Sequence, residues 1–218
     1  MKKMSFFTFV VILIIFIFST LFFSSRLLAQ NVNLGLSITD GKVRGFYFSI
    51  SNYFNVPESQ IVQIRERYRL ADDELPVVFF LATRAHVEPA AIIDLRLKGL
   101  TWWDITLHFG LNPEIFFVPV TTVKIGPPYG QAFGYYRQYR QRKTWGKVVL
   151  ADADIINLVN LKFISEYHKI PADRIIEMRA RGQHFVEINE TFVKEKGKGK
   201  EQAENPKAKP GKGKGRKK

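Results

Sequence analysis

The chain has 218 residues, of which 46% are hydrophobic and 14% aromatic, and its formal net charge is +13. This length and composition suit one domain with a hydrophobic core and terminal extensions. Because the chain contains no cysteine, a disulfide framework, a thiolate zinc site and an acylated cysteine are excluded. The charge is unevenly spread: residues 194–218 hold 11 Lys or Arg against 3 Glu, and residues 1–29 add 3 basic residues and no acid. Residues 30–193 therefore carry only +2 of the +13.

Residues 1–29 predict an export segment. Lys2 and Lys3 precede an 18-residue run without charge, residues 6–23. A cleaved signal peptide has an apolar region of about 7–15 residues, whereas an uncleaved anchor needs about 20. Both interpretations stay open, with Gln30 as the first residue after cleavage. In either case the basic end stays in the cytoplasm, so the rest of the chain is expected in the periplasm or at the outer surface.

The next part of the chain predicts three helices. Apolar residues recur at three- and four-residue steps over residues 43–54, which is typical of a helix face, although the preceding Asp-Gly pair could instead turn a hairpin. Residues 57–68 predict a second helix. Residues 72–86 predict a third, which begins with acids at its positive end and is apolar nearly all round. We expect this third helix to be the most buried.

One segment of the sequence occurs twice. Residues 89–110 read PAAIIDLRLKGLTWWDITLHFG and residues 171–192 read PADRIIEMRARGQHFVEINETF. The two segments align without a gap from Ile92, which corresponds to Ile175. A partial third copy lies at residues 57–65. Such repetition indicates one supersecondary unit that stacks on the next.

Each full copy predicts two helices joined by a glycine turn. The leading proline of each copy suits the first turn of a helix. Gly99 and Gly182 stand where a helix needs a left-handed residue at its C-terminal end. Thr101 with Asp104 predicts a capping box that opens the second helix, and Gly110 is expected to end that helix.

A charged pair is predicted in each copy. An arginine falls inside the apolar arc of the first helix, where an unpaired charge is too costly to bury. An acid follows each of these arginines by eight residues, across the turn. The pairs either form a charged site or fix the angle between two helices, and the second role is favoured. The predicted structural ion pairs are Arg96–Asp104, Arg179–Glu187 and Arg65–Asp73.

Residues 99–118 contain GLTWWDITLHFGLNPEIF, which resembles the G-L-S-W-x-E-I-x-x-x-L-G-[IV] core of helix-turn-helix proteins of the recombinase and repressor type. The resemblance implies a trihelical packing unit, and in that family the following helix reads DNA. Residues 112–118 stand at that position here, and they contain Glu114 but no Lys or Arg. Because DNA contacts depend on basic and amide side chains, no sequence-specific DNA binding is expected.

Two segments between the copies are candidate binding surfaces. Residues 114–120 are apolar after the first position, and they either cover the core or contact a protein partner. Residues 119–147 are rich in Pro, Gly and aromatic residues and predict a long loop. Aromatic rings interleaved with arginines can stack on bases and grip phosphates, although such a loop can equally pack on the body with its arginines in water. The candidate anion-binding residues are Tyr135, Tyr136, Arg137, Arg140, Arg142 and Lys143.

The C-terminal part predicts one more long helix and a tail. Asp152 and Asp154 begin the last long helix, which runs to His168 and precedes the second copy. Beyond Val193 no apolar side chain is larger than alanine. Residues 194–218 are therefore expected to be disordered, because they cannot bury enough surface to fold.

The sequence predicts no catalytic residue, metal site or cofactor. It has no HExxH, GxSxG, GxGxxG or Walker motif, and its four histidines are expected to be structural. The expected fold is mostly α, a small helical domain at residues 30–193 of two to three repeated helix–turn–helix units. The function predicted first is that of an exported, non-enzymatic helical interaction or structural protein. The alternative is a polyanion-binding protein, for anionic lipid, polysaccharide or nucleic acid, that acts through the basic tail and residues 135–147. An exported hydrolase is a distant third.

Overall fold

A computed structural model describes residues 41–121, 125–138 and 149–204 of the chain, with side chains in 41–121, 125–134 and 149–197. The regular elements in these ranges are all helices, which confirms the expected mostly α fold. The described residues all belong to one compact unit.

The predicted export segment at residues 1–29, with its apolar run at 6–23, lies outside the described residues. In the ranges that are described, no single helix is long and apolar enough to cross a membrane. One bent pair, Asp72–Ala85 with Pro89–Leu97 at 120°, qualifies by length and composition alone. Export is therefore a proposal that rests on the sequence of residues 2–23.

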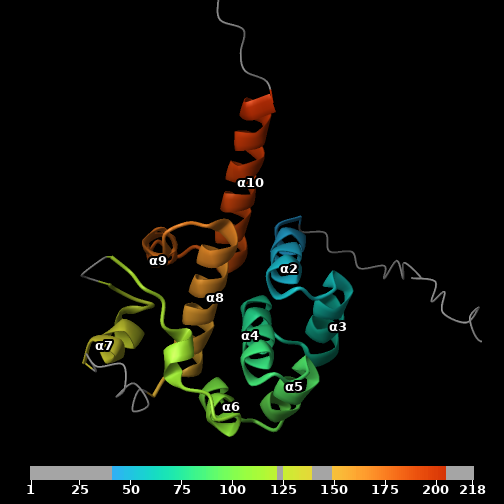
Figure 1. The fold of residues 1–218 in the computed structure, drawn as a ribbon, viewed down its shortest axis with the longest axis vertical. Helices are drawn as coiled ribbons and strands as arrows, with labels where there is room; N and C mark the ends of the chain where they lie inside the picture. The colour runs from blue at the N-terminus through green and yellow to red at the C-terminus, as the bar shows by residue number, and fades with distance from the viewer. Residues whose placement is uncertain (1–40, 122–124, 139–148, 205–218) are drawn as a thin grey trace, which may run out of the picture. The chain divides into compact units, whose positions relative to one another are not determined.

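Figure 1 shows the helices in chain order. They are α2 (Gly41–Phe54), α3 (Glu58–Tyr68), η1 (Asp72–Glu74), α4 (Leu75–Ala85), α5 (Pro89–Leu97), α6 (Trp102–His108), η2 (Pro113–Phe116), α7 (Gly130–Gln138), α8 (Asp152–His168), α9 (Ala172–Ala180) and α10 (Phe185–Glu204), where η marks a 3-10 helix. The helices expected at 43–54, 57–68, 72–86 and 152–168 are confirmed as α2, α3, η1 with α4, and α8.

Two helices, α4 and α8, pack against each other, and both contact α2. All residues from Leu75 to Ala82 are buried, which confirms α4 as the expected buried apolar helix. Aromatic rings join α2 to α8, because Phe46 stands edge-on to Phe163 with the ring centroids 5.8 Å apart. The last helix, α10, returns to lie beside α2, and this is the most extensive contact between described helices.

Three of the longer helices end in the same way. Asn55, His86 and Lys169 follow α2, α4 and α8, and their φ angles of 54°, 56° and 60° lie in the left-handed region. The N-cap of the next helix comes two residues later in each case. The prediction that both leading prolines lie in the first turn of a helix holds for Pro89, the first residue of α5, whereas Pro171 is the N-cap of α9.

The glycine turns and the capping box are confirmed. Gly99 and Gly182 have φ angles of 88° and 87°, and Gly110 has 66°. Thr101 Oγ1 accepts from the Asp104 backbone N–H at 3.0 Å, and the Thr101 N–H donates to Asp104 Oδ2 at 3.1 Å. These local signals therefore place the start and end of α6.

The apolar segment at residues 114–120 covers the core. Phe116 and Val118 are buried, and the ammonium group of Lys162 donates to the carbonyl oxygens of Ile115 and Phe117 at 3.1 and 3.2 Å. Burial lowers the pKa of Lys162. At the position of a DNA-reading helix the chain forms only the short 3-10 helix η2.

The prediction of a long loop over residues 119–147 is wrong in part, because α7 lies within it. Tyr129 and Phe133 are both buried and stand four residues apart, on one side of the chain as it enters this helix. A four-residue spacing of aromatic residues indicates a helix. The prediction of a loop gave more weight to the surrounding Gly and Pro residues.

The predicted disorder from residue 194 is wrong for the first part of the tail, because α10 continues to Glu204 and is longer than α8. Two ion pairs hold the start of this extension. Lys194 Nζ lies 2.7 Å from Glu190 one turn earlier, and Arg174 Nη2 lies 2.7 Å from Glu195. Lys, Glu and Gln also have high helix propensity, which a lack of apolar residues does not reveal. Residues 205–218 lie outside the described residues.

Candidate functional site

The guanidinium of Arg96 is fixed at the turn between α5 and α6. Its Nη1 donates to the carbonyl oxygen of Leu100 at 3.1 Å, and the group lies 4.5 Å from the centroid of the Trp102 ring. Its Nη2 contacts Glu74 Oε1 at 3.0 Å. Arg96 thus ties the turn, the next helix and the start of α4 together.

Arg179 makes the same set of contacts at the turn between α9 and α10. Its Nη1 donates to the carbonyl oxygen of Gln183 at 2.6 Å, and the guanidinium lies 4.5 Å from the centroid of the Phe185 ring. Its Nη2 donates to Asn157 Oδ1 at 3.3 Å. Each of these contacts stands at the same sequence offset from its counterpart at Arg96, so the two aligned segments share their local geometry as well as their sequence.

The predicted ion pairs Arg96–Asp104 and Arg179–Glu187 are wrong. Asp104 accepts from Thr101, and Glu187 Oε2 accepts from the backbone N–H of His184 at 3.1 Å. A short acidic side chain in the first turn of a helix reaches back to the exposed N–H groups there more readily than across to the arginine. The Thr101 hydrogen bonds lower the pKa of Asp104.

The third predicted pair, Arg65–Asp73, is also wrong, by one residue. Arg65 Nε donates to Asp72 Oδ1 at 3.2 Å, and the same oxygen accepts from the Tyr47 hydroxyl at 2.6 Å. Burial, with Asp72 as a further cause, raises the pKa of Tyr47. Asp72 is therefore engaged on the α2 and α3 side, which leaves Asp73 to face the other way.

The two arginine clusters differ in their carboxylates, since Asn157 replaces Glu74 at Arg179 and Asp152 has no counterpart there. Asp152, the first residue of α8, bridges the Arg96 cluster: its Oδ2 lies 2.6 Å from Arg96 Nη1, and its Oδ1 accepts from the Trp102 backbone N–H at 2.7 Å. Among the described residues no carboxylate makes these two contacts with Arg179 and the Phe185 N–H. The second cluster opens instead onto a pocket.

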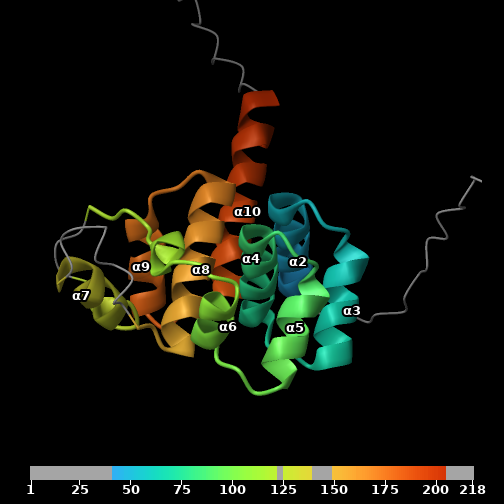
Figure 2. The same ribbon diagram turned by 60° about the horizontal axis from the view of Figure 1, so that its bottom comes forward.

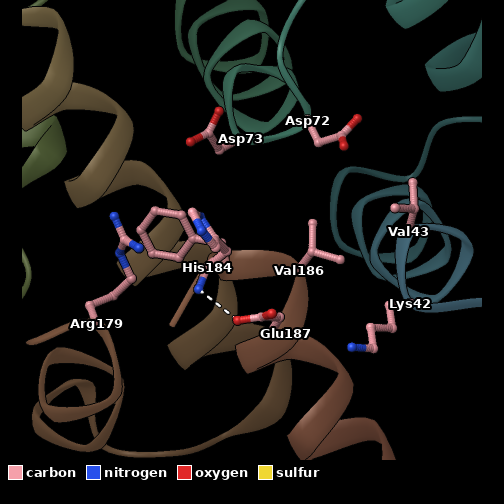
Figure 3. A pocket seen from close by; sticks show the side chains of 9 residues that line it. Lys42, Val43, Asp72, Asp73, Arg179, His184, Val186 and Glu187 are labelled. Carbon is pink, nitrogen blue, oxygen red and sulfur yellow. Dashed lines mark hydrogen bonds between the residues drawn. The ribbon is translucent and has the colours of Figure 1, made fainter. Parts of the chain in front are cut away.

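The pocket has a volume of about 360 Å³ and lies where three parts of the chain meet (Figure 3). One wall is the start of α2, the second is η1, and the third is the end of α9 with the first turn of α10. Its lining consists of Lys42, Val43, Asp72, Asp73, Arg179, His184, Phe185, Val186 and Glu187. Charged groups of both signs therefore face one small volume.

Asp73 is the acid that distinguishes this pocket. Burial raises its pKa, and the charge of Arg179 acts in the opposite direction. No described residue lies within ion-pair distance of its carboxylate, although Arg179 is close enough to influence it. Lys42 on the α2 wall is 3.8 Å from Glu190. The Tyr129 hydroxyl is also near Arg179, and burial raises the pKa of this tyrosine.

The pocket brings together three of the six residues predicted as ion pairs, Asp73, Arg179 and Glu187, from segments far apart in the sequence. The sequence did not indicate that Lys42 and His184 would join them, because Lys42 stands in no motif and His184 had no predicted role within the second repeated segment. Of the predicted anion-binding residues, Tyr135, Tyr136 and Arg137 belong to α7 but have no described side chains, and Arg140, Arg142 and Lys143 lie outside the described residues.

Comparison of the chain with protein-family models, with curated proteins and with solved structures gives no match. Among the residues that the structure describes, no three His, Asp or Glu side chains are grouped so as to hold a metal ion. The geometry of the pocket and of the two arginine clusters is therefore the basis for a functional proposal.

Proposed function

We propose that the chain is an exported, non-enzymatic helical protein that holds a partner molecule, and that its body is built from repeated helix–turn–helix units. The observation that carries this proposal is the common set of contacts of Arg96 and Arg179. Each arginine binds the carbonyl oxygen four residues on and stacks on the aromatic ring six residues on. Groups bound in this way hold helices together and are not available as general acids or bases.

The repeated architecture is supported by the equal steps between helix ends. The left-handed residues Asn55, His86 and Lys169 stand ten residues before Arg65, Arg96 and Arg179, respectively. The acids at the start of α6 and α10 also cap their helices in the same way. A chain that repeats one packing unit creates extended surfaces for partners, which is the usual role of such architectures.

Two measurements test this proposal. Fractionation of cells with N-terminal sequencing should recover the chain outside the cytoplasm, beginning at Gln30 or retained in the membrane from Met1. Full-length soluble chain in the cytoplasm contradicts export. Incubation of the purified chain with cell-envelope extract should leave the small-molecule composition unchanged by mass spectrometry, whereas new hydrolysis products would favour the hydrolase.

Polyanion binding is the second candidate, and the charge of residues 194–218 favours it. Residues 205–218 hold seven of the 11 basic residues in that segment, beyond the end of α10. Such a segment binds anionic polymers by releasing counterions, so binding weakens steeply with salt. Deletion of 205–218 should lower retention on an anionic matrix and flatten its salt dependence. The matched control replaces the same seven residues with Gln, and equal retention by both variants and the intact chain shows that the tail is inert.

A further inference from the structure

The two arginine clusters can be compared directly, because they share their turn contacts while only the Arg96 cluster contains carboxylates, those of Glu74 and Asp152. At Arg96, the Asp152 carboxylate joins the guanidinium to the first N–H of α6. At Arg179, the guanidinium, the turn carbonyl and the stacked ring are all repeated, and the first residue of α10, Phe185, lines the pocket. The place that corresponds to the Asp152 carboxylate is therefore open to a carboxylate from outside the chain.

The electrostatics of Arg179 favour such an anion. Arg96 has two carboxylate partners, Glu74 and Asp152. Arg179 donates to the neutral oxygens of Gln183 and Asn157, and no described acid lies within ion-pair distance of it. Charge-assisted bonds from a guanidinium to a carboxylate are about twice as strong as neutral ones, and a first-turn N–H favours the same negative group.

A second group in the pocket, the Asp73 carboxylate, would be stabilised by a cation. Asp72 is bound by Arg65 and Tyr47, and Glu187 caps the His184 N–H. Asp73 forms no ion pair among the described residues and accepts a hydrogen bond only from its own backbone N–H, and it lies on the wall across from Arg179 (Figure 3). Its half-buried carboxylate is in an unfavourable environment that a positive group beside it would relieve.

We propose that this pocket binds a small zwitterion, a molecule with a carboxylate and an ammonium group a few atoms apart, such as an amino acid. The carboxylate contacts Arg179 and the Phe185 N–H, as Asp152 contacts Arg96 and the Trp102 N–H, and the ammonium group contacts Asp73. The volume of about 360 Å³ lies at the lower end of the range for small-molecule pockets, about 300–1,000 Å³. A simple anion such as phosphate fits less well, because three acids share the lining.

The experiment is isothermal titration calorimetry of the full chain with glycine, γ-aminobutyrate, ε-aminocaproate and lysine, and with acetate, methylamine and inorganic phosphate as single-charge probes. At least one zwitterion should bind about tenfold more tightly than acetate and methylamine. In ¹⁵N-resolved NMR, the same zwitterion should shift the Phe185 amide signal. No binding by any of the four zwitterions, or equal binding of acetate or phosphate, overturns the proposal.

Variants separate the two halves of the site. Asp73→Asn should weaken zwitterion binding about tenfold or more and leave acetate binding unchanged. Its matched control is Asp94→Asn, which removes an exposed acid from α5 outside the pocket lining. Unchanged zwitterion binding by Asp73→Asn contradicts the ammonium contact.

Arg179→Lys should abolish binding of both the zwitterion and acetate. Because Arg179 also holds helices together, its control is Arg96→Lys, which loses the equivalent packing contacts away from the pocket. A third variant, Val43→Phe, fills the pocket without changing any charge and should also reduce binding. Normal zwitterion binding by Val43→Phe or Arg179→Lys contradicts the site.

Discussion

His168 Nε2 and Asn189 Oδ1 lie 2.8 Å apart and join α8 to α10 in the buried interior. Both residues are almost fully buried, with 4% and 0% of their surface exposed. Burial lowers the pKa of His168, Lys196 lowers it further, and the bond to Asn189 acts in the opposite direction. The folded state therefore favours the neutral imidazole over the protonated one at the contact between these two helices.

The stability of the chain should fall with pH below about 6.5, the usual pKa of an unfolded histidine. In that range the unfolded chain binds a proton at His168 that the folded chain excludes, so the free energy of unfolding rises with pH. One such proton changes the free energy of unfolding by at most about 1.4 kcal/mol per pH unit. Denaturant melts between pH 5 and 8 measure this slope. His168→Gln should reduce it, and His108→Gln, at an exposed histidine, should not.

A double-mutant cycle should find coupling between Arg96 and Asp152 and none between Arg96 and Asp104. The first pair is in contact at 2.6 Å, and residues in contact couple by about 0.5–3 kcal/mol. Asp104 bonds only to Thr101 among the described residues, so its effect should add to that of Arg96 within about 0.5 kcal/mol. The variants are Arg96→Met, Asp152→Asn and Asp104→Asn, with the corresponding double variants. Urea unfolding measures the free energy of unfolding of each. Strong coupling of Arg96 with Asp104 would contradict the contacts described above.

Asn157→Asp should stabilise the chain by about 1 kcal/mol at neutral pH, because a hydrogen bond to a charged group contributes more than a neutral one. Asn157 accepts from Arg179, as Glu74 does from Arg96. The guanidinium should depress the pKa of the introduced carboxylate, so the gain is present above the unfolded pKa of about 4 and is lost as pH falls below it. Thermal melts at pH 7 and pH 3 measure both effects. A gain that persists at pH 3 would exclude an ion pair as its cause.

Alanine at Gly99 or Gly182 should destabilise the chain by about 1–2 kcal/mol, because both residues adopt positive φ angles that strain an L-residue. The cost is conformational, since no atom lies within 4 Å of either added Cβ. Gly45 lies inside α2 and also has open space around it. Gly45→Ala should therefore stabilise the chain by about 0.5–1 kcal/mol. Chemical unfolding of the three variants compares them, and equal effects at all three positions would rule out a conformational origin.

Features that depend on neighbours in the sequence could be predicted. Thr101 and Asp104 are three residues apart, and Gly99 lies just beyond the end of its helix. The cap and the turn could therefore be recognised from the sequence. The apolar periodicity of their helices likewise predicted that Arg96 and Arg179 would be partly buried charges. These predictions needed no knowledge of how the helices pack.

Partners that come from distant segments could not be predicted in the same way. Asp152 reaches Arg96 across 56 positions of the chain, whereas the spacing of charges along the sequence pointed to the nearer Asp104. The pocket depends on α2, η1 and α10 meeting, which no local pattern records. The helical extension beyond Val193 was missed because ion pairs and propensity, and not apolar burial, support it.

The contact between α2 and α10 has a consequence for the order in which the chain matures. At a synthesis rate of about 5–20 residues per second, α2 leaves the ribosome on the order of ten seconds before α10. Until then, the side of α2 that meets α10 has no cover. Nascent or shortened chains that end before residue 185 leave this side of α2 exposed, and chaperones and proteases act on such unfinished chains. Quality control can thus distinguish a chain that includes α10 from one that does not.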